Sequence, residues 1–365
     1  LAADLTGDGN RELITRESHD IHNLAIYKKQ GKSFQKILKY PFDGLGELWC
    51  GSIDNKGKNV IFATKIAGAG ENLMLTYDGK SLRHTPIEKL NLVAEDTLIM
   101  NNKFPVSIGY RMNVYNSSPG IDGADIDGDG YLDLVIGMSC WKYYSARVYK
   151  WRNNSWQLQT EKTLGNISNV KIIDMDEDGK KYILLTKNYT YDKILFKPSP
   201  FGSEDGIYIF KYNSKELEPV LQDTYPAGAD PGRDFKNVNH GKLNHVGSIV
   251  TLEHKSVAIK KAIPNQKDFQ RNFTSLHEFY SKNPSHFIGA KEIWILYRKD
   301  GEYRKIAISN VFKDHKIGDI NGDGKDELIF VTQDHKIFIC GLEQSEITAL
   351  KEIAIETKFD ESVKL

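Results

Sequence analysis

The acidic stretch DIDGDGYLDLVIG, residues 125 to 137, has the residue types and the spacing to bind a metal ion. Carboxylates occupy its first, third, fifth and ninth positions, and the seventh position offers a backbone carbonyl. These five residues are Asp125, Asp127, Asp129, Tyr131 and Asp133. A hard cation such as Ca²⁺ binds about six to eight oxygen atoms at roughly 2.3–2.6 Å, and the intervening glycines allow the positive φ angles of a tight turn. The stretch therefore predicts a calcium-binding loop.

Two other stretches, DLTGDGNRELI and DINGDGKDELIFV, repeat this pattern of oxygen-bearing residues. The expected ligands of the first are Asp4, Thr6, Asp8, Asn10 and Glu12, and those of the second are Asp319, Asn321, Asp323, Lys325 and Glu327. Asn10 and Lys325 stand at the seventh position and would contribute only backbone carbonyls. Three copies of one loop are much less expected from chance than a single acidic turn, so we predict about three calcium sites.

A fourth copy, DMDEDGKKYILL, is incomplete. It keeps Asp174, Asp176, Asp178 and the Lys180 carbonyl, but Tyr182 replaces the last carboxylate. We expect this site to be weak or empty. Two more eroded copies begin at Ser52 and Asn237, where a lysine or the loss of the acids removes the ligands, and no metal is expected there.

Each copy leads into an apolar strand and then into a β-hairpin. The six hairpins begin at Leu24, Leu73, Ala146, Gly206, Ile293 and Lys336. Alternating apolar residues interrupted by Gln-Gly, Asp-Gly or Asn-Asn turns are typical of hairpins. The strands that follow the loops also argue against an EF-hand, whose loop lies between helices. The sequence predicts an all-β protein built from a repeated loop, strand and hairpin.

These repeats resemble FG-GAP repeats, also called VCBS repeats, of the kind found in the integrin α-subunit head. The motif is well kept at 4–14, 125–137 and 319–331, while the Phe-Gly and Gly-Ala-Pro signatures of the family are poorly kept. The resemblance implies a β-propeller of six or seven four-stranded blades, with Ca²⁺ in the loop between the first two strands of a blade. It covers residues 1–365 as one domain.

Insertions are expected near 88–115, 187–203 and 255–290, where the spacing of the repeats lengthens. The third contains Phe269, Phe273, Leu276 and Tyr280 on one face of a helical pattern, so a short helix is predicted there. The helix either packs on the propeller or covers a ligand.

Composition restricts the classes of partner. Lys plus Arg and Asp plus Glu number 49 each, so no net positive charge favours nucleic acid, and no apolar run is long enough for a membrane span. The chain starts LAADLTGDG without a methionine, and we expect a mature or trimmed form. Three cysteines are too few and too scattered for a disulfide framework.

The pattern favours a binding module over an enzyme. The calcium would be structural, and a protein or glycan partner would bind to non-repeating loops on one face of the propeller. Calcium loops of this charge suit calcium-rich fluid, so we expect a secreted, extracellular or cell-surface protein. No catalytic residue and no ligand-binding residue is assigned, and the oligomeric state is left open.

An alternative is a propeller-fold polysaccharide lyase or dehydratase that acts on an acidic glycan. Such an enzyme needs a base, an acid and a positive charge to abstract a proton beside a carboxylate. The candidates are His240, His245, His254, His277, His286, Tyr280, Arg233 and Arg271. No spacing brings these side chains together, and the sequence leaves this activity open.

Overall fold

The structure is a computed structural model of the whole chain. It describes residues 1–16, 23–42, 45–53, 58–65, 70–90, 117–139, 145–164, 167–187, 205–225, 232–243, 247–259, 287–299, 302–309, 312–319, 326–332 and 337–340. These residues form antiparallel strands, and no helix is found among them. The described part of the chain accordingly contains no helix able to cross a membrane.

The N-terminal half of the strands forms three four-stranded sheets. The first contains β1 (Ala2–Ala3), β2 (Glu12–Arg16), β3 (Asn23–Gln30) and β4 (Ser33–Pro41). The second contains β5 (Leu45–Ser52), β6 (Asn59–Lys65), β7 (Gly70–Tyr77) and β8 (Leu82–Leu90). The third contains β9 (Ser117–Ala124), β10 (Asp133–Ser139), β11 (Ser145–Arg152) and β12 (Ser155–Thr163).

Two four-stranded sheets and one three-stranded sheet follow. The fourth contains β13 (Ile167–Ile173), β14 (Tyr182–Lys187), β15 (Asp205–Tyr212) and β16 (Leu217–Tyr225). The fifth contains β17 (Gly232–Leu243), β18 (Gly247–Ile259), β19 (Phe287–Lys299) and β20 (Glu302–Ser309). The sixth contains β21 (Phe312–Gly318), β22 (Glu327–Thr332) and β23 (Ile337–Cys340).

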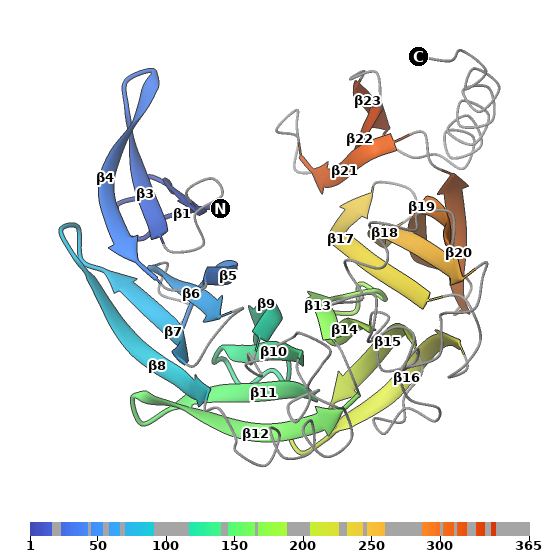
Figure 1. Cartoon of the computed structure of the whole chain (residues 1–365). Helices are drawn as coiled ribbons and strands as arrows, with labels where there is room; N and C mark the ends of the chain where they lie inside the picture. The colour runs from blue at the N-terminus through green and yellow to red at the C-terminus, as the bar shows by residue number, and fades with distance from the viewer. Residues whose placement is uncertain are drawn as a thin grey trace, which may run out of the picture.

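The sheets stand side by side along an arc, in chain order (Figure 1). Within each sheet the strands pair in sequence order, so each sheet is a simple up-and-down meander. The first strands of neighbouring sheets, from β5 through β9, β13 and β17 to β21, contact one another on the inside of the arc, and fourth strands such as β8, β12 and β16 lie outside. Radial repetition of small sheets defines a β-propeller, so the predicted fold class is confirmed.

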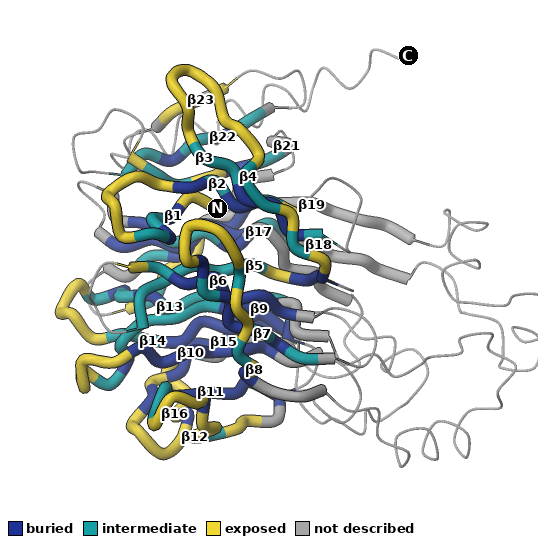
Figure 2. Tube along the Cα trace, turned by 90° about the vertical axis from the view of Figure 1, so that its left-hand side faces the viewer, coloured by how far each residue is buried: buried dark blue, intermediate teal, exposed yellow. Residues whose placement is uncertain are grey.

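The hydrophobic core lies between neighbouring sheets. Phe62 from β6 packs with Leu134 from β10 in one cluster, and Val135 from β10 packs with Phe210 from β15 in the next. The middle strands are therefore buried on both faces, whereas exposed residues concentrate on the outer strands and the loops (Figure 2). Each sheet depends on its neighbours for burial, which is the physical reason why such repeats occur in arrays.

Neighbouring inner strands approach closely enough to require glycine. A Cβ atom at Gly120 of β9 would lie 2.8 Å from the backbone nitrogen of Val170 in β13, inside the contact distance of real Cβ atoms. On the same interface the Asp122 carboxylate accepts a hydrogen bond from the Ile172 amide at 2.8 Å. The third and fourth sheets are thus joined by backbone contact and by a side-chain hydrogen bond.

Five of the six predicted hairpins are present as β3–β4, β7–β8, β11–β12, β15–β16 and β19–β20. Of the sixth hairpin, only the first strand, β23, lies in the described part of the chain. The eroded copy that begins at Asn237 forms no loop at its start, because β17 continues to Leu243. The number of blades, six or seven, stays a prediction because residues 91–116 and 341–365 lie outside the described part.

The expected insertions fall largely outside the described residues. Strand β8 runs to Leu90 and β14 to Lys187, so the first two insertions begin where these strands end. The third is shorter than expected at both ends, because β18 runs to Ile259 and β19 begins at Phe287. The predicted helix and its four apolar residues lie in 260–286, outside the described residues.

The meander topology gives the propeller two different faces. The acidic loops join first to second strands and the tight turns join third to fourth strands, so both lie at the same end of each sheet. The three long connections run from Leu90 to Ser117, from Lys187 to Asp205 and from Ile259 to Phe287. They join second to third strands or fourth to first strands. Their ends therefore lie at the opposite face.

Candidate metal-binding loops

The loop between β9 and β10 is organised around the first carboxylate of its motif. Asp125 accepts hydrogen bonds from the amides of Gly128 at 2.8 Å, Asp129 at 3.0 Å and Gly130 at 2.8 Å. Gly128 has a φ of 78°, in the left-handed region that glycine adopts without strain. The chain therefore wraps around this carboxylate, as the spacing of the acids and glycines predicts.

The wrap brings three carboxylates together. Asp125, Asp127 and Asp133 each offer an oxygen atom within 4.8 Å of the others. Asp133 is buried, and its Oδ2 accepts a hydrogen bond from the Ile126 amide at 2.9 Å. The other oxygen, Asp133 Oδ1, and Asp127 Oδ1 are buried and find no hydrogen-bond donor among the described residues. Buried carboxylate oxygens of this kind are suited to a cation.

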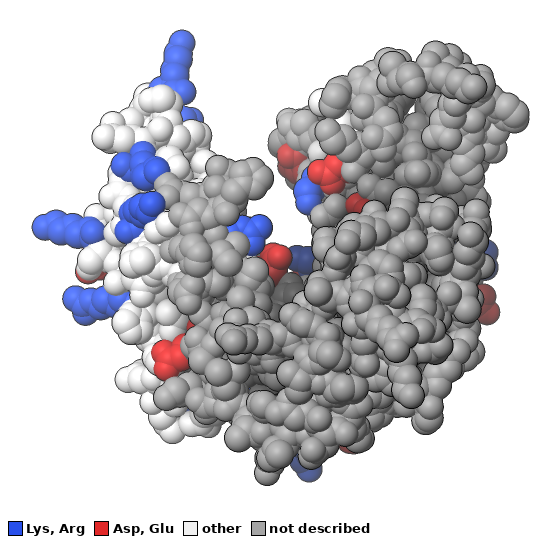
Figure 3. Space-filling model, in the orientation of Figure 1, with Lys and Arg blue, Asp and Glu red and all other residues white. Residues whose placement is uncertain are grey.

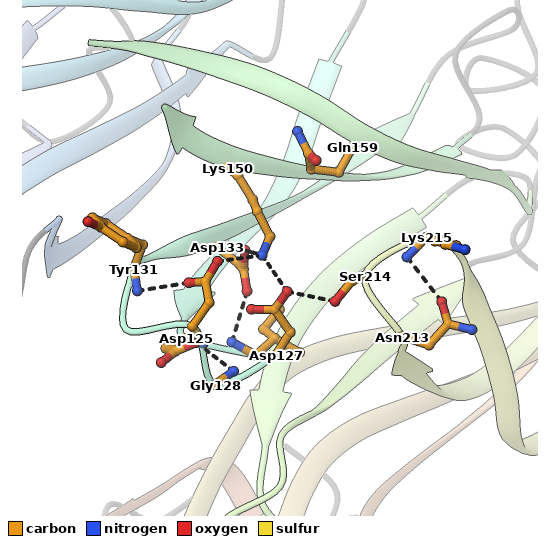
Figure 4. Close-up of polar contacts among 12 residues, drawn as sticks. Asp125, Asp127, Gly128, Tyr131, Asp133, Lys150, Gln159, Asn213, Ser214 and Lys215 are labelled. Carbon is orange, nitrogen blue, oxygen red and sulfur yellow. Dashed lines mark hydrogen bonds and ion pairs between the residues drawn. The ribbon is translucent and has the colours of Figure 1, made fainter. Parts of the chain in front are cut away.

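Two cationic side chains from β11, Lys150 and Arg152, also reach the loop, and Figure 4 shows the first of them. Lys150 stands opposite Asp133 in the strand register, and its Nζ contacts Asp127, Asp129 at 2.9 Å and Asp133 at 3.5 Å. Arg152 forms an ion pair with Asp129 and lies over the Tyr131 ring, 4.7 Å from its centroid. The ammonium of Lys150 is thus held among the carboxylates that a metal would use.

The next sheet adds a contact to the same loop. The hydroxyl of Ser214, in the turn between β15 and β16, donates a hydrogen bond of 2.8 Å to Asp127 Oδ2. Asn213 caps that turn by accepting from the amides of Lys215 at 3.0 Å and Glu216 at 2.9 Å. The acidic loop therefore connects the third and fourth sheets as well as two strands of its own sheet (Figure 4).

Burial and charge shift the pKa values in this loop in opposite directions. Burial raises the pKa of Asp133 to about 6. Burial alone would lower the pKa of Lys150, but hydrogen bonds to Asp127 and Asp129 raise it above its usual value. For Asp129, burial alone would raise the pKa, but the hydrogen bond from Lys150 lowers it below its usual value. In the absence of a divalent cation, the loop therefore keeps a proton on Lys150, and Asp133 takes one up at a higher pH than an exposed carboxyl group does.

The loop between β1 and β2 wraps around its first carboxylate in the same way, although among the described residues its acids do not form a group of three close ligand atoms. Asp4 accepts from the amides of Gly7 at 2.7 Å and Gly9 at 2.8 Å, as Asp125 does in the third sheet. Glu12 has no exposed surface, and its Oε2 accepts from the Leu5 amide at 3.0 Å. Its Oε1 is buried without a hydrogen-bond donor among the described residues. Loss of water alone would raise the pKa of Asp4, but these amide donors lower it.

Thr6, Asp8 and Asn10 complete the expected ligand set of the first loop. Asp8 accepts from the Asn10 amide at 2.8 Å and from Lys28 Nζ of β3 at 3.0 Å. The amide of Asn10, followed by Lys28, lowers the pKa of Asp8 to about 2. Lys28 also lies 3.7 Å from Glu12 Oε1. In the loop at Asp4 and in the loop at Asp125, a lysine from the third strand of the same sheet thus contacts the acids.

The loop between β13 and β14 is neutralised differently. Lys181 forms an ion pair of 3.5 Å with Asp174, and Lys180 pairs with Asp178 at 2.5 Å. The Tyr182 hydroxyl, at the position of the missing carboxylate, donates to Asp176 at 3.4 Å. Among the described residues, the acids of this loop do not form a group of three close ligand atoms. The expectation of a weak or empty fourth site stays a prediction.

The last acidic loop is described only at its two ends. Asp319 follows β21 and is exposed, and the half-buried Glu327 begins β22. Asn321, Asp323 and Lys325 lie outside the described residues. Strand order places this loop at the same face as the other acidic loops.

The residues of the lyase alternative are mostly outside the described part, namely His245, Arg271, His277, Tyr280 and His286. Arg233 in β17 and His254 in β18 stand in neighbouring strands, opposite Ser256 and Phe235 respectively. His240 is half-buried, and burial lowers the pKa of its ring. The lyase alternative therefore stays a prediction.

The oxygen donors of the loops that begin at Asp4 and Asp125, in the first and third sheets, fit a divalent cation. Each of these loops has a buried carboxylate oxygen without a hydrogen bond. The sequence motif did not reveal the lysines, since Lys28 and Lys150 lie 24 and 25 residues after the start of their loops. A signal for them does exist. The pairs Tyr27–Lys28 and Tyr149–Lys150 recur at the same place in two hairpins.

Charge is distributed unevenly although its sum is zero. The segment 23–42, which contains β3 and β4, carries five lysines and no acid. In Figure 3 the blue Lys and Arg side chains gather over the first two sheets, on the left of the view. Lys28 is the member of this group that points its charge at the acidic loop, as its ion pair with Asp8 shows.

Comparison with known proteins identifies the repeat. Residues 125–185, from the third acidic loop to the middle of β14, match the family model described as "FG-GAP-like repeat". No curated protein matches the chain significantly. In structure the chain is similar to a protein from Lactobacillus plantarum, with a TM-score of 0.49 and 12% identity over 94% of this chain and 83% of that one.

It is also similar to the rhamnogalacturonan lyase PL11 of Bacillus licheniformis, with a TM-score of 0.35 and 10% identity. That alignment covers 93% of this chain and 61% of the lyase, so the chain spans less than two thirds of the lyase's length. Residues 125–185 are thus similar to an FG-GAP-like repeat, within a chain whose sheets have the arrangement of a β-propeller.

Proposed function

We propose that the protein is a calcium-stabilised β-propeller binding module that recognises a protein or glycan partner. Calcium binding is supported by the loop between β9 and β10. There Asp125, Asp127 and Asp133 each offer a carboxylate oxygen within 4.8 Å of the others, and Asp133 is buried. Oxygen ligands and negative charge select a hard cation such as Ca²⁺. The ion would neutralise the carboxylates and fix the loop that starts β10, which makes its role structural.

The partner would bind at the face opposite the acidic loops. The three long connections that break the repeat all begin and end at that face, next to Leu90, Lys187 and Ile259. In repeat proteins, insertions on one face commonly form the binding surface. Strands β18 and β19, with 13 residues each, extend the fifth sheet toward the same side. This arrangement supports a binding function that is separate from the calcium loops.

Removal of calcium should lower the melting temperature of the full chain. A site that is saturated a hundredfold above its dissociation constant stabilises the fold by about 2.7 kcal/mol. Thermal unfolding in EDTA and in excess calcium measures the difference. Asp129→Ala should reproduce part of the loss in calcium, and Glu302→Ala, at an exposed position on β20, serves as the control. Melting that is indifferent to EDTA would contradict the calcium assignment.

Two assays address the partner. A glycan array with the calcium-loaded protein tests recognition of carbohydrate, and incubation with uronate polymers tests for the absorbance of unsaturated products. We expect binding without new absorbance. Product formation would instead favour the polysaccharide lyase.

A further inference from the structure

The cations that contact the acidic loops come from a fixed place in the sheet. Lys150 lies in the third strand of its sheet, opposite Asp133, and its side chain is only 8% exposed. Its Nζ reaches three of the four carboxylates of the loop. A divalent ion that used Asp127 and Asp133 would therefore lie close to a buried positive charge.

The first sheet repeats this arrangement. The register Leu13↔Tyr27 puts Lys28 of β3 next to Glu12, and Lys28 Nζ lies 3.0 Å from Asp8 and 3.7 Å from Glu12. Its side chain is 38% exposed, so its charge is better screened by water than that of Lys150. Two loops with the full acidic motif thus contain an internal ammonium.

We infer that Lys28 and Lys150 are built-in competitors of the divalent cation, which neutralise part of the acidic charge of the loops in the first and third sheets when no metal is bound. The physical reason is charge: the ammonium interacts favourably with the carboxylates when no metal is present, and it repels a divalent ion that approaches the same oxygens. This inference rests on the proposed calcium binding and states what limits the affinity of these two loops.

Calcium titration calorimetry of the chelator-treated full chain tests the competition at the third loop. Lys150→Met keeps the length of the side chain and removes its charge, and we expect it to tighten calcium binding at one site by about tenfold or more. Lys162→Met, an exposed lysine on β12 of the same sheet, should leave the isotherm unchanged. An unchanged isotherm for Lys150→Met would overturn the inference.

Thermal unfolding gives a second readout. In EDTA, Lys150→Met should melt below the wild type, because its carboxylates lose their counter-charge, and calcium should recover more stability than it does in the wild type. Equal melting of the two proteins in EDTA would overturn the role of Lys150. A wild type that binds no calcium, beside a Lys150→Met variant that does, would refute the proposed calcium function and still support the competition.

A variant in the first sheet covers the case in which Lys150→Met does not fold. Lys28→Met makes the same change beside Asp8 and Glu12 and should tighten calcium binding at one site, by less than Lys150→Met because Lys28 is better screened by water. Lys32→Met, at an exposed position in the turn between β3 and β4, is its matched control and should leave the isotherm unchanged. An unchanged isotherm for Lys28→Met would overturn the inference for the first sheet.

Discussion

Replacing Phe62 by alanine should lower the free energy of unfolding by about 3–5 kcal/mol, the usual cost of deleting a buried aromatic ring. Phe62 has no exposed surface and lies between the second and third sheets. Its ring is 5.2 Å from that of Trp49 and 5.5 Å from that of Trp156. The substitution would open a cavity that two rigid indole rings cannot fill, so the neighbouring sheets would lose part of their common core.

Urea unfolding at constant calcium concentration measures this cost. Phe34→Ala is the matched control, because Phe34 is 52% exposed on β4 and its loss should change stability by less than about 0.5 kcal/mol. If both variants lost equally little stability, the contact between the second and third sheets would not be the core that the structure describes.

Acidification should destabilise the fold through His315. This histidine of β21 is 1% exposed, and both ring nitrogens lack a hydrogen-bond partner among the described residues. Burial lowers its pKa from 6.5 to about 4. The folded state therefore binds fewer protons than the unfolded state between these values. The resulting stability is fully present above pH 6.5 and is lost as the pH falls to about 4, a loss of about 3 kcal/mol.

The comparison of wild type with His315→Gln isolates this effect from the carboxylates that titrate in the same range. Unfolding free energies at pH 7 and at pH 5 should differ more in the wild type than in the variant. His84→Gln, at an exposed position on β8, should keep the wild-type difference. The same pH dependence in wild type and His315→Gln would show that this ring does not titrate on unfolding.

Local spacing was enough to predict the repeating part of the fold. The alternation of apolar residues in hairpins such as the one from Ala146, and the acid–glycine pattern from Asp125, depend on contacts within a single sheet, which sequence distance reports directly. In the structure Asp4 and Asp125 each accept hydrogen bonds from amides of their own loop, and Asp133 is buried against the Ile126 amide. That these carboxylates bind a metal ion stays a prediction.

Contacts that depend on strand register or on packing between sheets could not be predicted from the motif. Lys150 reaches the loop because the register pairs it with Asp133, and Ser214 reaches Asp127 because the next sheet lies alongside. Neither residue is near the motif in sequence. The buried His315 also depends on packing, since its surroundings come from other strands. The sequence predicts an eroded acidic loop that begins at Asn237, whereas strand pairing extends β17 through this segment.

The difference between the two faces of the propeller relates the acidic loops and the long connections to the proposed function. The acidic loops and the tight turns share one face, and the ends of the long, non-repeating connections share the other. Under the proposed function, a structural ion on one face would stiffen the array without contacting the partner. Loss of calcium would weaken partner binding only through the stability of the propeller.

A crystal structure of the full chain grown in excess calcium tests the central claim most directly. The anomalous difference map should show a calcium ion at roughly 2.3–2.6 Å from oxygen atoms of Asp125, Asp127 and Asp133, with a higher occupancy in Lys150→Met. Acidic loops that all remain without an ion at saturating calcium would contradict the account.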